Sequence, residues 1–326
     1  MKRLISILVS LIILLFIYWK IDFDGLIQVL RNCDRLWMAI SLGMVIPITM
    51  LTAWRLQQLM PNSSPASHPP QPPASLAFAE ANKLILAASS LNMVLPSKMG
   101  DIAKAYFMQD RGHLTGSLAL SLVVFEKTCD MLSLLLWCVF GLLLYPQKDV
   151  LFWGMTFGVT VGLLLGLAIL CFPKFARSFF ALVQSVSPKK LRAKLGKMSF
   201  AWQEMHDYFW RDKQHLLKLA LTSIFIWFLH LLQIWFFILA LNAYTPFLTN
   251  LALSPLAILA GLLPLTFAGV GTRDAALILF YQPYFDAATG AALGVLCTSR
   301  YFLPAIGGLP FLQKYLNLAK RSKPLA

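Results

Sequence analysis

The chain has 326 residues, of which 58% are hydrophobic and 13% are charged, and its formal net charge is +14. Soluble globular domains carry roughly a quarter charged residues, so this composition excludes an ordinary soluble fold and indicates a polytopic membrane protein. In such a protein, basic cytoplasmic segments and anionic lipid headgroups account for the excess of Lys and Arg, and we expect no nucleic-acid partner.

The N-terminal sequence MKRLISILVSLIILLFIYWK resembles a signal peptide. It lacks a small-residue cleavage site and runs into Lys20, so we predict an uncleaved first membrane span over residues 4–19. A second span is predicted over residues 36–54, because this apolar run approaches the length that crosses a bilayer. The proline-rich segment 61–73 that follows is typical of a flexible linker.

The next apolar segment, 76–96, contains polar residues and breaks at the stretch LPSKMGDIAKAY. A helix end at membrane depth has free backbone N–H groups that attract anions, and the two lysines of this stretch add positive charge. We therefore predict that the break binds an anionic headgroup, with Asp101 capping the following helix or pairing with a lysine. The substrate-binding residues predicted here are Asn92, Pro96, Lys98, Gly100, Asp101 and Lys104.

Two further spans are predicted over residues 116–145 and 151–172. The first contains Glu126, Lys127 and Asp130, and its two acids share one helix face because they are four residues apart. Glu126 lies about ten residues into this span, which is about 15 Å along an α-helix and close to the middle of the bilayer. Charges at that depth are costly, so these three residues are candidates for function.

The segment 173–218 contains ten Lys or Arg against three Asp or Glu, which indicates the cytoplasmic side of the membrane. The N-terminus, residues 98–113 and the basic tail 316–326 are expected on the same side. Within the segment, residues 175–215 are predicted to form an amphipathic helix at the inner headgroups. Its apolar face would hold Leu191, Leu195, Met198, Trp202 and Met205.

The last third of the chain repeats the earlier pattern, with a span over 216–241, a broken apolar segment at 251–282 and a last span over 288–312. The break LPLTFAGVGTRD has glycines that allow close backbone approach and an arginine that can bind phosphate oxygens in a fork. Its aspartate is either the partner of the arginine or a proton carrier. The substrate-binding residues predicted here are Gly269, Gly271, Arg273 and Asp274.

Counting spans from the basic ends puts both ends of each broken segment on one side, so 76–96 and 251–282 are predicted to enter the membrane and return. The chain is then an all-α polytopic membrane protein with about six full spans and two re-entrant elements in an inverted repeat. Two ordinary kinked helices are the alternative. We expect a single membrane domain over residues 1–315 with the tail after it.

Arg300 lies about twelve residues into the last span, at a depth similar to that of Glu126. Their spans are counterparts in the two repeats, so we predict a Glu126–Arg300 contact within an intramembrane network that includes Lys127 and Asp130. An ion pair that only orients the helices is the structural alternative.

The sequence offers no motif for a cofactor or a metal. Its five cysteines have no CxxC or metal-ligand spacing, and its five histidines do not form a ligand set. No GxxxxGK[ST] loop of an ATPase is present, and neither HExxH nor GxSxG occurs. We therefore expect no cofactor, no metal and no enzymatic activity.

The stretches LPSKMGDIAKAY, VVFEKTCD and PLTFAGVGTRDAAL, with the late Arg300, together resemble the transmembrane region of the lysylphosphatidylglycerol synthase/flippase family. That family typically shows Leu-Pro-x-Arg-x-Gly-Asp before a basic residue, Glu-Arg-x-x-Asp in a span, and Pro…Gly-x-Gly-x-Arg-Glu later. Here Lys98 and Lys127 stand for arginines, which loses the bidentate fork, and Asp274 stands for a glutamate. The resemblance covers roughly residues 1–315. It implies a stand-alone lipid translocase without the soluble aminoacyl-transfer domain.

These features predict a multi-pass protein of the bacterial cytoplasmic membrane that moves or binds an anionic lipid between leaflets without its own ATPase. The expected partners are membrane lipids with anionic headgroups, either phospholipids or polyprenyl phosphates. One alternative is an intramembrane lipid-modifying enzyme with Glu126 or Asp101 as the base. The other is a non-transporting partner of an enzyme of lipid or glycolipid synthesis.

Overall fold

The computed structural model is built from α-helices throughout the residues that it describes, which confirms the all-α class. The described residues are 23–60, 76–94, 100–110, 114, 116–145, 148–187, 189–262 and 271–321. The first part of the chain holds α2 (Phe23–Arg31), α3 (Arg35–Gly43), α4 (Val45–Leu59), α5 (Phe78–Val94), α6 (Gly100–Asp110), α7 (Gly116–Leu144) and α8 (Val150–Cys171). The second part holds α9 (Pro173–Val186), α10 (Lys189–Arg211), α11 (Lys213–Ala240), α12 (Phe247–Leu262), α13 (Thr272–Tyr281), α14 (Ala287–Ser299) and α15 (Phe302–Arg321).

Five segments are long and apolar enough to cross a membrane, and they match the spans predicted after the first. They are Arg35–Leu59, Leu118–Leu144, Val150–Cys171, Lys213–Ala240 and Ala287–Gln313. The first and last of these each consist of two consecutive helices, α3 with α4 and α14 with α15. The predicted first span at 4–19 and the linker at 61–73 lie outside the described residues. Helix α15 continues to Arg321, past the predicted domain boundary at 315.

Four helices begin at an aspartate whose carboxylate accepts a hydrogen bond from a backbone N–H of the first turn. The N–O distances are 2.9 Å for Asp34, 2.8 Å for Asp149, 3.0 Å for Asp212 and 2.8 Å for Asp286, at the starts of α3, α8, α11 and α14. Such a cap satisfies an N–H that has no acceptor within the helix and contributes about 1 kcal/mol. The short local signal of an aspartate before an apolar run therefore fixes where each of these spans starts.

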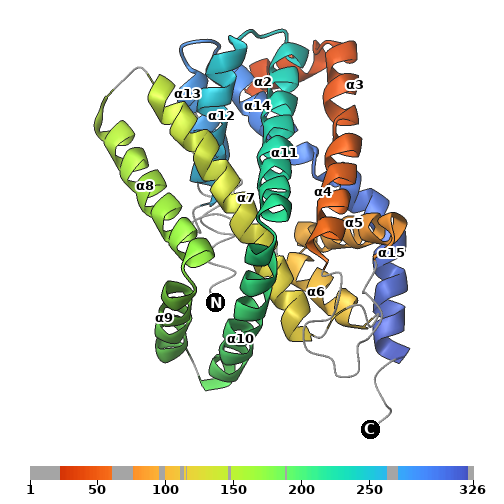
Figure 1. Cartoon of the computed structure of the whole chain (residues 1–326). Helices are drawn as coiled ribbons and strands as arrows, with labels where there is room; N and C mark the ends of the chain where they lie inside the picture. The colour runs from red at the N-terminus through yellow and green to blue at the C-terminus, as the bar shows by residue number, and fades with distance from the viewer. Residues whose placement is uncertain are drawn as a thin grey trace.

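The two broken segments form two antiparallel helix pairs, α5 with α6 and α12 with α13. Figure 1 shows α12 and α13 at the upper end of the molecule, and α5 and α6 in its lower half. The prediction that 76–96 turns back within itself is wrong, because α5 is one continuous helix and α6 is the returning limb. Residues 95–99 and 263–270, which connect the limbs, lie outside the described residues. The arrangement agrees with the predicted inverted repeat.

Each helix pair packs against a span of the other repeat through a glycine. A Cβ atom added at Gly141 of α7 would overlap the carbonyl oxygen of Ala252 on α12. A Cβ atom added at Gly308 of α15 would likewise overlap the carbonyl oxygen of Leu86 on α5, where Ser90 Oγ also donates to Ala305 O over 2.6 Å. Small residues let helix backbones approach closely in membranes, where apolar burial alone does not drive association. The repeats are thus held together by two equivalent contacts.

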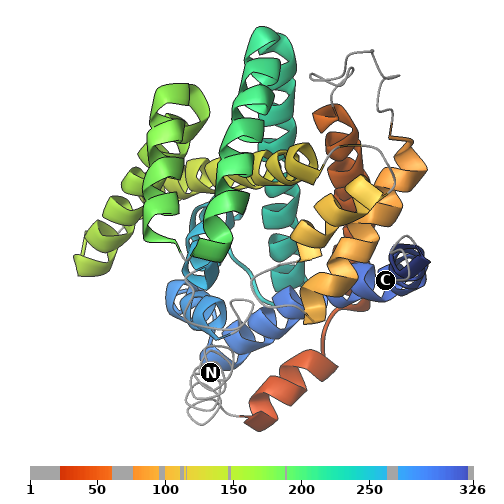
Figure 2. The same ribbon diagram turned by 90° about the horizontal axis from the view of Figure 1, so that it is seen from below.

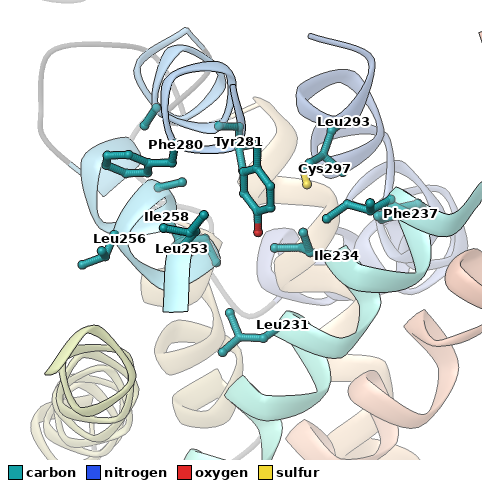
Figure 3. Packing of buried hydrophobic residues seen from close by; sticks show 14 of the residues in the cluster. Leu231, Ile234, Phe237, Leu253, Leu256, Ile258, Phe280, Tyr281, Leu293 and Cys297 are labelled. Atoms are coloured by element: carbon teal, nitrogen blue, oxygen red, sulfur yellow. The ribbon is translucent and has the colours of Figure 1, made fainter. Parts of the chain in front are cut away.

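The apolar core is divided into two clusters. The upper cluster joins α7, α8 and α11 to α14, and includes Leu231, Phe237, Leu256 and Leu293 (Figure 3). Within this cluster, the Tyr281 hydroxyl donates a hydrogen bond to Asn250 Oδ1 over 2.9 Å. The lower cluster joins α4 to α7 with α9, α10 and α15. Along α7 the lower cluster ends at Cys129 and the upper one begins at Leu134, and Asp130 and Ser133 lie between these two positions.

The predicted amphipathic segment 175–215 forms the hairpin of α9 and α10, which lies at the lower end of the molecule. Trp202 and Met205 are buried against α7 rather than facing lipid, and Trp202 packs on Phe125. Figure 2, seen from below, shows α7 crossing the molecule from the α8 side to the α5 and α6 side. The hairpin therefore braces the lower half of the tilted α7.

Candidate functional site

A cavity of about 330 Å³ is lined by charged and polar side chains together with apolar ones. Side chains from α4, α5, α6, α7, α11, α13 and the α14–α15 junction form its wall. The charged residues of the wall are Arg55, Asp101, Glu126, Lys127, Asp130, Arg273 and Arg300, and its uncharged polar residues are Thr49, Thr52, Ser89, Asn92, His230, Gln233, Thr298 and Tyr301. Residues of both helix pairs therefore reach one chamber.

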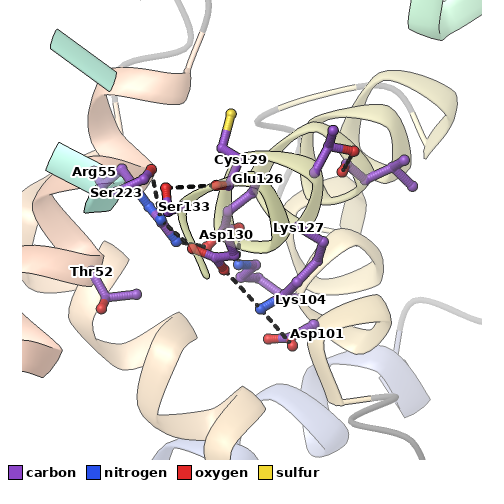
Figure 4. Close-up of polar contacts among 12 residues, drawn as sticks. Thr52, Arg55, Asp101, Lys104, Glu126, Lys127, Cys129, Asp130, Ser133 and Ser223 are labelled. Carbon is purple, nitrogen blue, oxygen red and sulfur yellow. Dashed lines mark hydrogen bonds and ion pairs between the residues drawn. The ribbon is translucent and has the colours of Figure 1, made fainter. Parts of the chain in front are cut away.

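One group of charges joins α4 to α7. Arg55 donates from Nη2 to Glu126 Oε1 over 3.1 Å and contacts the Asp130 carboxylate through Nη1, which also donates to Ser223 Oγ over 2.9 Å (Figure 4). Arg55 is 2% exposed and Glu126 is 1% exposed. A buried charge without a partner is strongly unfavourable, so this guanidinium and the two carboxylates hold one another in place.

Arg55 is not among the predicted site residues, because it lies one residue beyond the predicted end of the second span. Helix α4 continues to Leu59, which carries Arg55 inside the molecule. The available signal was the lone arginine in an otherwise uncharged run, TAWRLQQL, directly after an apolar span.

The same carboxylates are shared with lysines of α6 and α7. Lys104, which was predicted to bind a headgroup, contacts Glu126 Oε2, is fully buried and is not among the residues that line the cavity. Lys127 Nζ lies 2.9 Å from Asp101 Oδ2 and 3.5 Å from Asp130 Oδ2. Asp101 therefore pairs with a lysine, which is one of the two roles predicted for it.

A second group of charges joins α13 to α14. Arg273 Nη2 lies 2.7 Å from Asp274 Oδ1, 2.6 Å from Thr298 Oγ1 and 3.1 Å from the carbonyl oxygen of Gly294. The other Asp274 oxygen accepts from the N–H of Gly271 over 3.1 Å, and Gly271 has φ 99°, a conformation that favours glycine. Of the two roles predicted for Asp274, the geometry supports that of partner to Arg273.

The predicted contact between Glu126 and Arg300 is wrong. Both oxygens of Glu126 are occupied by Arg55 and Lys104, and Arg300 instead donates from Nη1 to Gln233 Oε1 over 3.1 Å. Arg300 Nη2 lies 3.2 Å from the hydroxyl of Tyr301. The two charges are at the same cavity, yet each is bound to its own neighbouring helices. The position of a residue along a span gives its height in the bilayer, but it does not give the direction in which the side chain points.

The remaining predicted residues separate into three groups. Asn92, predicted to bind substrate, is among the residues that line the cavity. Gly100 is buried, and a Cβ atom there would overlap the carbonyl oxygen of Ala88, so this glycine serves the packing of α6 on α5. Pro96, Lys98 and Gly269 lie outside the described residues.

Within the part of the chain that the structure describes, no group of three His, Cys, Asp or Glu side chains is placed to hold a metal ion. The long apolar helices and the two helix pairs define a membrane domain, and a cavity with several charged side chains lies inside it.

The chain belongs to the family described as the lysylphosphatidylglycerol synthase TM region, whose profile matches residues 3–308. This finding confirms the resemblance drawn from the sequence motifs. No curated protein and no solved structure matches the chain.

Proposed function

We propose that this protein moves an anionic lipid, a phospholipid or a polyprenyl phosphate, between the two leaflets of the bacterial cytoplasmic membrane. It would act as a translocase without enzymatic activity and without an ATPase of its own. Membrane lipids with anionic headgroups would be its partners. The basic hairpin of α9 and α10 and the end of α15 would face the cytoplasm, because cytoplasmic segments are enriched in Lys and Arg.

One observation carries this proposal: a single cavity is lined by residues of both helix pairs, which lie toward opposite ends of the molecule. Asn92 and Asp101 reach it from α5 and α6, and Arg273 reaches it from α13. A binding site at the meeting point of two broken helical elements is characteristic of transporters that alternate access between the two sides. Interrupted backbone at membrane depth is tolerated where it is buried or borders a wet cavity.

The chemistry of the wall supports an amphipathic ligand. Apolar side chains such as Ile48, Ile85 and Ile226 line the chamber beside charged groups that are held by ion pairs. A charged side chain inside a membrane is costly unless it is paired or functional, and six of the seven charged residues of the wall are in ion pairs. A lipid headgroup would occupy the polar wall, and its acyl or prenyl chains would extend along the apolar one.

Transbilayer movement of labelled lipids in proteoliposomes tests the proposal. Vesicles with and without the purified protein would carry phosphatidylglycerol, phosphatidylcholine or a polyprenyl phosphate with a fluorophore that dithionite reduces. Protein-dependent access of dithionite to inner-leaflet phosphatidylglycerol or polyprenyl phosphate, without added nucleotide, is expected. Equal access in protein-free vesicles would contradict translocation. A changed lipid mass after incubation would favour the lipid-modifying enzyme instead.

A further inference from the structure

Arg300 has no carboxylate partner among the described residues, unlike the other cations of the cavity wall. Arg55 and Lys127 each contact carboxylates of α6 or α7, and Arg273 contacts Asp274. The partners of the Arg300 side chain among the described residues are neutral: the amide oxygen of Gln233, the Tyr301 hydroxyl and, at 3.5 Å, the carbonyl oxygen of His230. Its positive charge is therefore not compensated by a carboxylate of the described chain.

The Arg300 guanidinium is also incompletely hydrogen-bonded. Arg300 is 4% exposed, and its Nε is a buried donor that has no acceptor among the described residues. A buried, uncompensated guanidinium with an unused N–H is costly, and an anion from outside the chain would remove that cost. Because the residue lies in the cavity wall, a ligand in the cavity can reach it.

The backbone at the same position adds positive potential. The last span is broken between Ser299 and Phe302, and the 20-residue helix α15 begins there. The first N–H groups of a helix have no acceptor within it, and its N-terminal end carries partial positive charge. Tyr301 and Pro304, at this end of α15, line the cavity beside Arg300. The Tyr301 N–H donates to Thr298 O over 3.1 Å and proline has no N–H, so the helix end acts on the cavity through its partial charge rather than through direct hydrogen bonds. An anion there would meet both the guanidinium and the helix end.

We propose that Arg300 and the first turn of α15 form the anion-binding subsite of the cavity, and that the ligand group bound there is a phosphate. Phosphate oxygens match the planar donors of arginine, and the partial positive charge of a helix N-terminus favours an anion. This inference rests on the proposed function for the lipid nature of the ligand. It replaces Lys104 and Arg273, which carboxylates already neutralise, as the predicted headgroup anchors.

Calorimetric titration of the purified full chain in an uncharged detergent tests the subsite. The probes are dihexanoyl phosphatidylglycerol, geranylgeranyl monophosphate and inorganic phosphate, which distinguish a lipid phosphodiester, a lipid phosphomonoester and free phosphate. The variants are Arg300→Gln, Arg300→Lys and a control, Lys218→Gln, which removes one cation from an exposed position of α11. Thermal melting of each variant would report whether it is folded.

We expect Arg300→Gln to weaken binding of the lipid probe by about tenfold or more, because loss of one partner of a buried charge pair is costly. Lysine keeps the charge but lacks Nε and the planar fork, so Arg300→Lys should show an intermediate loss, and Lys218→Gln should bind like the wild type. Binding of inorganic phosphate with the same dependence on Arg300 would support the phosphate subsite and show that free phosphate can also fill it.

Wild-type affinity in folded Arg300→Gln would overturn the inference. If Arg300→Gln does not fold, wild-type affinity in Arg300→Lys would overturn it. Failure of the proposed function gives a different result, namely no binding of either lipid probe to the wild-type protein. Lipid binding that Arg300 does not affect contradicts only the position of the subsite.

Discussion

Arg55 on α4 and Glu126 on α7 form an ion pair across the cavity wall, with 3.1 Å between Nη2 and Oε1 and side chains that are 3% and 1% exposed. The second oxygen of Glu126 is held by Lys104 of α6, which is fully buried. This carboxylate therefore connects three helices, and the structure assigns it to the framework that shapes the cavity. The cations that Glu126 neutralises would be left in a low-dielectric interior without it.

Glu126→Gln should destabilise the protein by about 3–5 kcal/mol, because two buried cations lose a shared partner. Adding Lys104→Met removes one of these cations, so the double variant should be more stable than the sum of the single effects predicts. Adding Arg300→Gln instead should give simple additivity, because Arg300 does not contact Glu126. Thermal melting in detergent measures all of these variants. Coupling between Glu126 and Arg300 as strong as that with Lys104 would contradict the network.

The contact of Gly308 with Leu86 predicts a sharp contrast between two adjacent glycines of α15. Gly308→Ala should lower stability, because its Cβ would overlap the Leu86 carbonyl oxygen and push α5 away. Gly307→Ala is the matched control: a Cβ there meets nothing within 4 Å, and alanine is the better helix former by about 1 kcal/mol. Melting temperatures of the two variants measure the difference. A Gly308→Ala protein that is as stable as Gly307→Ala would show that the helices do not meet there.

The Arg273–Asp274 ion pair allows an effect on stability to be distinguished from an effect on lipid transfer. The Asp274 residue is 6% exposed, and Arg273→Gln removes the cation that pairs with its carboxylate. Both stability and lipid transfer should therefore fall. Neutralising the partner as well, in Arg273→Gln/Asp274→Asn, should restore much of the stability. We expect lipid transfer to remain low in the double variant, since Arg273 also lines the cavity. Recovery of transfer together with stability would make this pair structural only.

The orientation of the molecule can be tested by cysteine labelling of intact cells in a variant without the native cysteines. A cysteine at Lys190, in the basic hairpin of α9 and α10, should be protected from an impermeant thiol reagent until the cells are permeabilised. A cysteine at Tyr284, which is 40% exposed at the opposite end between α13 and α14, should be labelled directly. Labelling of position 190 from outside would reverse the topology.

Much of the fold follows from local features of the sequence. Apolar length predicts the spans, and an aspartate before α8, α11 or α14 marks where the helix starts. The two breaks were recognisable because Pro, Gly and charged residues interrupt apolar runs at corresponding positions of the two repeats. Those signals depend on residues that are close together in the chain, so one sequence is sufficient to detect them.

The charge partners could not be predicted in the same way, because they depend on helix rotation and on contacts between distant segments. Similar depth and corresponding positions in the two repeats predict a Glu126–Arg300 pair that the structure does not contain. Arg55 lies just beyond the predicted end of its span, although helix α4 continues to Leu59. The position of Lys104 after a break predicts a cation that can meet a headgroup, whereas the packing of α6 on α7 encloses its side chain. The sequence therefore identifies residues that line the cavity more reliably than it identifies the ion pairs between them.

The central claim, that the cavity is the path of the lipid, is tested most directly by filling it. Ser89 of α5 lines the cavity, so Ser89→Trp would place an indole in the chamber, whereas Ser178→Trp puts the same side chain on the exposed surface of α9. The measurement is the initial rate of transbilayer movement of labelled phosphatidylglycerol or polyprenyl phosphate in proteoliposomes containing equal amounts of folded protein. We expect Ser89→Trp to abolish most of the protein-dependent rate and Ser178→Trp to retain it. An unchanged rate in the Ser89→Trp protein would contradict a path through this cavity.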